Sequence, residues 1–162
     1  MKHFISRRNF LKAAGVTAAA SAMAAAVPQA SAGFLTGKDA AVTILYTNDV
    51  HTYIDNKSPK LTYAAIAAMK QGYVDEGKPV LLVDAGDHIQ GTAYGSMDNG
   101  ATIIELMNEA GYDIATLGNH EFDYGMARAK AIIKEADFPY VSCNWVDLRT
   151  GLRVLPAVKL FP

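Results

Sequence analysis

The chain has 162 residues, of which 51% are hydrophobic and 19% are charged, and this composition indicates a globular protein rather than a disordered one. The first 32 residues contain four cations and no acidic residue, so 11 of the 15 basic residues remain against all 16 acidic ones, a net charge of −5 without a basic run. This balance argues against a nucleic-acid binder, and the single cysteine, Cys143, excludes an internal disulfide framework and a multi-cysteine metal site.

Residues 1–32 are predicted to be a twin-arginine signal peptide. The motif SRRNFLK at 6–12 precedes a mildly apolar stretch at 13–27, and Ala30-Ser31-Ala32 offers a signal-peptidase site. The apolar stretch is shorter than the roughly 20 residues that a stable membrane span needs. We therefore expect cleavage near Ala32–Gly33, transport by the twin-arginine translocation machinery, and a periplasmic or secreted protein. Because this route carries folded proteins, a metal could be loaded before export.

The next part of the chain predicts a strand, a helix and a second strand. Residues 42–47 are β-branched and apolar, which is typical of a buried strand. Residues 61–76 have helical spacing, and Gly77 marks the end of that helix. Its predicted apolar face consists of Leu61, Ala64, Ala65, Ala68 and Met69. Residues 79–83 form another apolar run and predict the second strand.

A glycine-punctuated loop then leads to a helix at 101–110, a strand at 113–117, a helix at 126–136 and a strand at 140–143. Alternating apolar strands and helices predict an α/β fold, with a parallel sheet that has helices on its faces. Ligands bind such sheets beyond the carboxyl ends of the strands. The residues at these ends are therefore the candidates for a functional site.

Metal-binding residue types follow three of the predicted strands. They lie in the segments Asp49-Val50-His51, Gly86-Asp87 and Gly118-Asn119-His120-Glu121. Carboxylate, imidazole and amide groups are ligands for divalent ions such as Mn²⁺, Zn²⁺ or Mg²⁺. A carboxylate at a central strand end can also bridge two ions about 3.5–4 Å apart. The sequence therefore predicts a metal site at this edge of the sheet.

Three longer motifs, TNDVH at 47–51, VDAGD at 83–87 and LGNHEFD at 117–123, resemble the first signature blocks of the calcineurin-like metallophosphoesterase superfamily. The match is best with the branch of 5′-nucleotidases and UDP-sugar hydrolases. The resemblance implies a metallophosphoesterase-type sheet with flanking helices, of which this chain would hold the N-terminal βαβαβαβ portion. It also implies a nucleotide or related small phosphate ester as substrate and two divalent ions as cofactors.

The resemblance further implies a role for each site residue. Asp49 and His51 would bind the first ion, Asp87 would bridge both, and Asn119 would bind the second. His120 would face the scissile phosphate, and Asp123 would orient it, while a metal-bound hydroxide attacks.

The family pattern also includes a later lone histidine and a Gly-His-x-His block, but no histidine follows His120 in this chain. We therefore expect residues 33–162 to be the N-terminal part of a catalytic domain, with the rest of it and a C-terminal substrate domain missing. Such a fragment would be inactive alone. A naturally short chain is the alternative.

Two rival functions remain open at this stage. The first is a periplasmic manganese thiol-sulfate hydrolase of sulfur oxidation, which shares the architecture, and the second is a non-catalytic periplasmic binding protein. Among neighbouring residues, His88 is expected to lie outside the ligand set, either supporting the ligands from behind or exposed, and Asp84 is expected to support the strand end. Glu121 is a weaker candidate than Asp123 for orienting His120, and Cys143 is expected to be buried.

Overall fold

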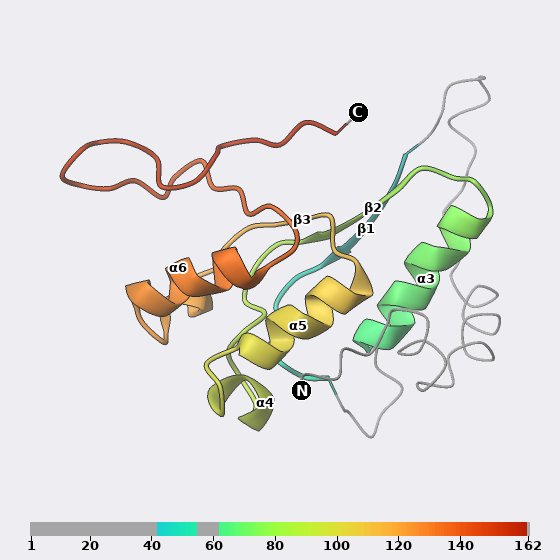
Figure 1. Ribbon diagram of the computed structural model, residues 1–162, viewed down its shortest axis with the longest axis horizontal. Coiled ribbons are helices and arrows are strands. Elements are labelled where there is room, and N and C mark those ends of the chain that lie inside the picture. The colour runs from blue at the N-terminus through green and yellow to red at the C-terminus, as the bar shows by residue number, and fades with distance from the viewer. Residues whose placement is uncertain (1–41, 55–61, 162) are drawn as a thin grey trace, which may run out of the picture. The chain divides into compact units, whose positions relative to one another are not determined.

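The structure is a computed structural model that describes residues 42–54 and 62–161 (Figure 1). The predicted signal peptide and Leu61 lie outside these residues. The described residues form two compact units, one of residues 42–45, 54 and 62–81 and the other of residues 46–53 and 82–161. Strands β1 and β2 each run from the first unit into the second, and the candidate site belongs to the second.

The first unit contains helix α3, Tyr63–Asp75. The Thr62 side chain accepts a hydrogen bond from the Ala65 amide at its start, and Gly77, at a φ of 69°, follows its end as predicted. The predicted apolar face is wrong, because the buried side chains are those of Tyr63, Ile66 and Ala67. Tyr63 and Ile66 have more apolar area to bury than the alanines of the predicted face.

The sheet has three strands in the order β1-β2-β3. Their bounds are Thr43–Thr47, Val80–Asp84 and Ile114–Ala115. Strands β2 and β3 are parallel, with Val83 opposite Ile114 and Asp84 opposite Ala115. Strand β1 is less buried than predicted, since the side chains of Ile44 and Tyr46 are 61% and 71% exposed.

The third and fourth predicted strands are shorter than expected. Strand β3 has two residues instead of five, and the segment predicted as a fourth strand makes a single parallel bridge between Ala115 and Tyr140. The amide of Val141 still bonds to Ala115, but the amide of Ser142 bonds to Pro156. The backbone leaves the sheet after this single bridge.

Three α-helices and a 3-10 turn complete the second unit. They are α4 (Ala93–Ser96), α5 (Ala101–Ala110), η1 (His120–Phe122) and α6 (Met126–Glu135). Sequence reasoning predicted α5 and α6 but not α4 or η1. Helices α5 and α6 lie beside each other (Figure 1), and the Asn108 side chain donates to the Glu135 carbonyl between them.

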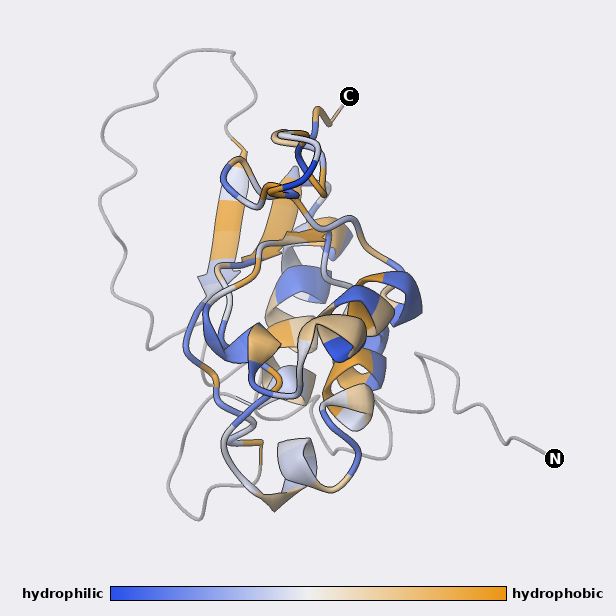
Figure 2. Ribbon diagram, turned by 90° about the vertical axis from the view of Figure 1, so that its left-hand side faces the viewer, coloured by the Kyte–Doolittle hydropathy of each residue, from blue (hydrophilic) through white to orange (hydrophobic). Residues whose placement is uncertain are grey.

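The core of the second unit is apolar and comes from strands, helices and the loop after β2. Its fully buried members include Leu82, Ile89, Ile103, Ile104, Met107, Ala129 and Ile132. The helices carry both apolar and polar residues in Figure 2, as expected for segments with one buried side. None of the helices in the described part of the chain is long and apolar enough to cross a membrane.

Candidate functional site

The site is built from the loops that follow β1, β2 and β3. The first two loops are joined through their backbones, since the Asp49 amide donates to Gly86 O and the His51 amide to Asp87 O, both at 3.0 Å. The third loop is joined to the second, because the His120 amide donates to Asp87 Oδ1 at 2.9 Å. Consecutive parallel strands therefore bring the three sequence motifs to one edge of the sheet.

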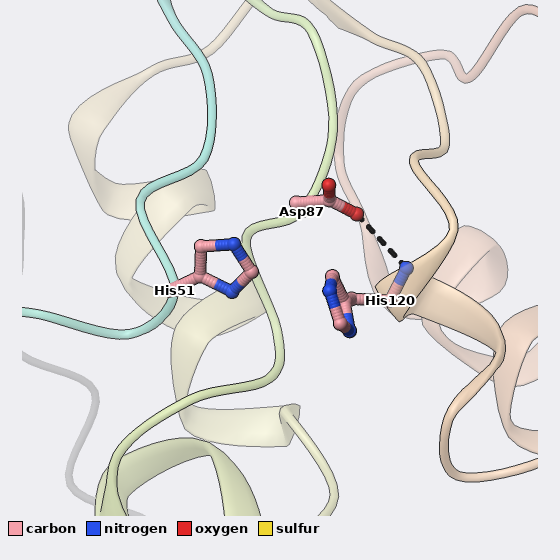
Figure 3. A group of neighbouring side chains, drawn as sticks. All are labelled: His51, Asp87 and His120. Atoms are coloured by element: carbon pink, nitrogen blue, oxygen red, sulfur yellow. Dashed lines mark hydrogen bonds between the residues drawn. The ribbon is translucent and has the colours of Figure 1, made fainter.

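His51, Asp87 and His120 converge at this edge (Figure 3). One donor atom from each lies within 4.8 Å of the others, and all three residues are half-buried. The two imidazole rings meet edge to face with their centroids 4.9 Å apart. The His51 ring is held by a contact of 3.1 Å between its Nδ1 and the Gln90 carbonyl. A carbonyl accepts, so Nδ1 carries the proton and Nε2 is the nitrogen with an available lone pair.

Asp49 lies beside this group and is more exposed. Its Oδ1 is 3.8 Å from His51 Nε2, and its side chain is 61% exposed. Its other oxygen accepts from the Asn48 amide group. Asp49 thus lies next to His51 without belonging to the converging group, and its assignment to an ion stays a prediction.

Asn119 is exposed at the start of η1 and lines a cavity of about 350 Å³. The cavity is also lined by Leu117, Gly118, Phe122, Ser142, Asn144 and Trp145. The Trp145 and Phe122 rings meet edge to face with their centroids 5.2 Å apart, so Trp145 packs against a neighbouring side chain of the protein. The assignment of Asn119 to an ion stays a prediction.

His120 is paired with Asp123, three residues later. Nδ1 of His120 lies 2.7 Å from Asp123 Oδ2, with both side chains more than a third exposed. The hydrogen bond to the Asp123 carboxylate raises the pKa of His120 above its ordinary value. The predicted orienting role of Asp123 requires this contact, and the role itself stays a prediction.

The donor set fits a divalent cation. A carboxylate and two imidazoles, with a second carboxylate beside them, are ligands that borderline divalent ions accept. Asp49, His51 and Asp87 also hold positive φ angles of 52°, 47° and 60°. Such left-handed backbone is uncommon outside glycine and clusters at functional sites. The three residues whose donor atoms converge include His120. The sequence predicted that His120 faces the substrate and does not bind an ion.

A buried polar network lies next to this site, and sequence reasoning identified it only in part. Asp84 supports the strand end as predicted, accepting from Thr47 Oγ1 at 2.6 Å and from the Gly86 amide at 2.9 Å. Of the two places expected for His88, beside the ligands or exposed, the structure shows the first, since His88 is fully buried. Its Nδ1 lies 2.8 Å from Asp84 Oδ1 and its Nε2 lies 2.8 Å from the Tyr140 hydroxyl.

Neighbouring carboxylates counteract the effect of burial on the pKa of His88. Burial alone would lower the pKa of His88, but the hydrogen bond with Asp84 and the nearby charge of Glu121 raise it above the ordinary value. Glu121 is itself fully buried, and the hydrogen bonds that it accepts from the described residues come from backbone N–H groups. Its Oε1 also lies 3.6 Å from His88 Nδ1. These contacts therefore do not indicate that Glu121 helps Asp123 to orient His120.

Cys143 is exposed, contrary to the prediction. The predicted strand does not continue past Tyr140, so Cys143 lies in a loop where its carbonyl accepts from the Arg153 side chain.

Comparison with known proteins agrees with this geometry. Residues 42–158 match the calcineurin-like phosphoesterase family, and residues 5–27 match the twin-arginine translocation signal sequence, which marks the protein for export. A snake venom 5′-nucleotidase from Gloydius brevicauda is 40% identical over 114 residues, which cover 64% of this chain and 19% of that protein. The chain thus spans about a fifth of the length of the curated relatives that it matches.

Two solved structures show the same fold. The calcineurin-like phosphoesterase YfkN from Bacillus subtilis has a TM-score of 0.60 and 33% identity, covering 71% of this chain and 40% of that one. The sulfate thiohydrolase SoxB from Thermus thermophilus has a TM-score of 0.65 but only 16% identity, over 80% of this chain and 34% of that one. From the family match over most of its described residues, this chain belongs to the calcineurin-like phosphoesterase family.

Proposed function

We propose that this chain belongs to an exported, metal-dependent phosphoesterase that hydrolyses nucleotides or related phosphate esters. The observation that carries the proposal is the convergence of His51, Asp87 and His120 at the carboxyl edge of a parallel sheet, in a chain of this family. The 5′-nucleotidases among its relatives support a nucleotide as the substrate. The export signal supports action in the periplasm or outside the cell.

In this proposal, four residues hold two divalent ions. Asp49 and His51 bind one, Asn119 binds the other, and Asp87 bridges them. Manganese and zinc both suit this mixture of oxygen and nitrogen donors. When bound, such ions neutralise charge on a phosphate and lower the pKa of water toward neutrality.

His120 acts on the substrate through its Nε2. Because Nδ1 faces the Asp123 carboxylate at 2.7 Å, the ring is fixed with Nε2 directed elsewhere. The hydrogen bond with Asp123 raises the pKa of His120 and so favours the protonated form of the ring. A protonated Nε2 can stabilise negative charge on the phosphate oxygens or give a proton to the departing oxygen.

The division of the chain is also part of the proposal. Residues 1–32 would be the signal peptide, and residues 33–162 would be the N-terminal part of the catalytic domain. No histidine follows His120, so further ligands of the family pattern would have to come from outside these 162 residues. The chain by itself should then bind metal weakly and show no turnover.

The test combines metal binding with product release. Manganese titration by calorimetry on the product of the complete gene should show binding that Asp87→Ala abolishes and that Asp75→Ala, an exposed control on α3, leaves unchanged. The product of the complete gene should release phosphate from AMP. Release of sulfate from a thiosulfonate substrate without phosphate release would contradict the proposal and favour thiol-sulfate hydrolysis, and two ions retained by the Asp87→Ala protein would contradict the ligand set.

A further inference from the structure

We propose that Glu121 is a positioning residue of the metal site, whose buried carboxylate fixes the loop that carries Asp87 against the loop that carries Asn119 and His120. The inference rests on the proposed metal site. It concerns a residue that touches neither the three converging donor atoms nor the cavity beside Asn119.

The contacts of Glu121 join two loops that lie more than 30 positions apart in the sequence. Oε2 accepts from the amide of Asp87 at 2.8 Å and from the amide of Gly118 at 2.6 Å. Oε1 accepts from the amide of His88 at 2.8 Å and, more weakly, from that of Ile89 at 3.4 Å. One side chain therefore receives backbone donors from both loops.

The chemistry of these contacts requires a carboxylate. All the groups that face the two oxygens in these bonds are N–H donors, so both oxygens must accept. A glutamine would turn an NH₂ group toward one set of donors and leave that set without an acceptor. An aspartate keeps both acceptors, but it is one methylene shorter and cannot reach both loops in the same geometry.

The position of the Asp87 carboxylate depends on this arrangement. Asp87 has a left-handed backbone at a φ of 60°, and its Oδ1 is held by the His120 amide. Gly118 lies so close that an added Cβ would be 2.1 Å from Asp87 Oδ1. The third loop thus holds the Asp87 backbone through Glu121 and the Asp87 side chain through His120. Loss of the Glu121 bonds removes the backbone half of that restraint.

The test is a manganese titration by calorimetry of the complete gene product and its Glu121→Gln variant. Loss of a group that orients a metal ligand weakens metal binding by about 10–100-fold, and we expect a loss of this size. The matched control is Asp113→Asn. Asp113 also accepts a backbone amide of β2, at 2.7 Å from Leu82 N, but it lies at the opposite end of β3. Its manganese affinity should be unchanged.

Two further measurements keep the outcomes distinct. Glu121→Asp should lie between wild type and Glu121→Gln, and it replaces Glu121→Gln as the test if the latter does not fold. Hydrogen exchange of the metal-free chain should show faster exchange at the amides of Asp87, His88 and Gly118 in either variant. Wild-type affinity in both variants, or an equal loss in Asp113→Asn, would overturn the positioning role. If His51→Ala binds manganese like wild type, the proposed site is wrong, and the exchange measurement still decides whether Glu121 ties the loops together.

Discussion

Gly118→Ala tests how closely the second and third loops must approach. An alanine Cβ at this position would lie 2.1 Å from Oδ1 and 2.5 Å from Cγ of Asp87. Ordinary contact begins at 3.4 Å, so the carboxylate must retreat by about 1.3 Å. Gly118 is not among the glycines with positive φ, so the backbone itself accepts alanine and the effect is steric.

The expected result follows from that displacement. A misplacement of about 1 Å in a reacting group can cost about 10²-fold, and we expect manganese affinity to fall by roughly this factor. Overpacking should also lower the free energy of unfolding by about 1–3 kcal/mol. Calorimetric titration and urea denaturation measure the two effects separately.

Gly72→Ala is the matched control, because a Cβ at Gly72 in α3 meets no atom within 4 Å. It should leave metal binding unchanged and raise the free energy of unfolding by about 0.5–1 kcal/mol, since alanine is the better helix former. A Gly118→Ala protein with wild-type affinity and wild-type stability would refute the close approach of the two loops.

Three other substitutions address single groups. Asp87→Ala should remove bound metal and phosphate release together, and elemental analysis checks the metal. His120→Ala should lower turnover of the complete gene product by about 10²–10⁴-fold with nearly unchanged metal content, and a loss of metal would instead make His120 a ligand. Tyr140→Phe removes the hydroxyl 2.8 Å from the buried His88 Nε2 and should lower the free energy of unfolding by about 1–3 kcal/mol in urea denaturation. An unchanged urea midpoint would mean that this bond contributes nothing to stability.

The sequence predicted the elements that contain a regular apolar pattern. Strands β1 and β2 and helices α5 and α6 begin and end within a residue or two of their predicted bounds. The lengths of β3 and of the segment at Tyr140 were not predictable, because they depend on which backbone groups find partners elsewhere. Helix α4 is four residues long and glycine-containing, so it has no periodicity to detect.

The candidate site was predictable for a different reason. Strand ends of a parallel sheet meet at one edge, so polar residues that follow the strands must lie near each other. The pattern therefore predicted that the loops carrying His51, Asp87 and His120 lie together. The ligand set of Asp49, His51, Asp87 and Asn119 stays a prediction. The pattern could not predict that His88 and Glu121 turn inward. Their burial depends on the left-handed backbone at Asp87 and on amide donors that only the folded loops bring together.

The left-handed residues at the site have a consequence for the choice of metal. Asp49, His51, Thr52 and Asp87 each carry a conformational cost on the order of 1–3 kcal/mol, which is met when the polypeptide folds. An arriving ion need not organise the loops, so its affinity should follow the intrinsic order of the divalent metals, rising from manganese toward copper. Occupancy would then reflect which ions are plentiful in the compartment where folding occurs. A protein that is exported by the twin-arginine route after folding has folded in the cytoplasm, so that compartment is the cytoplasm.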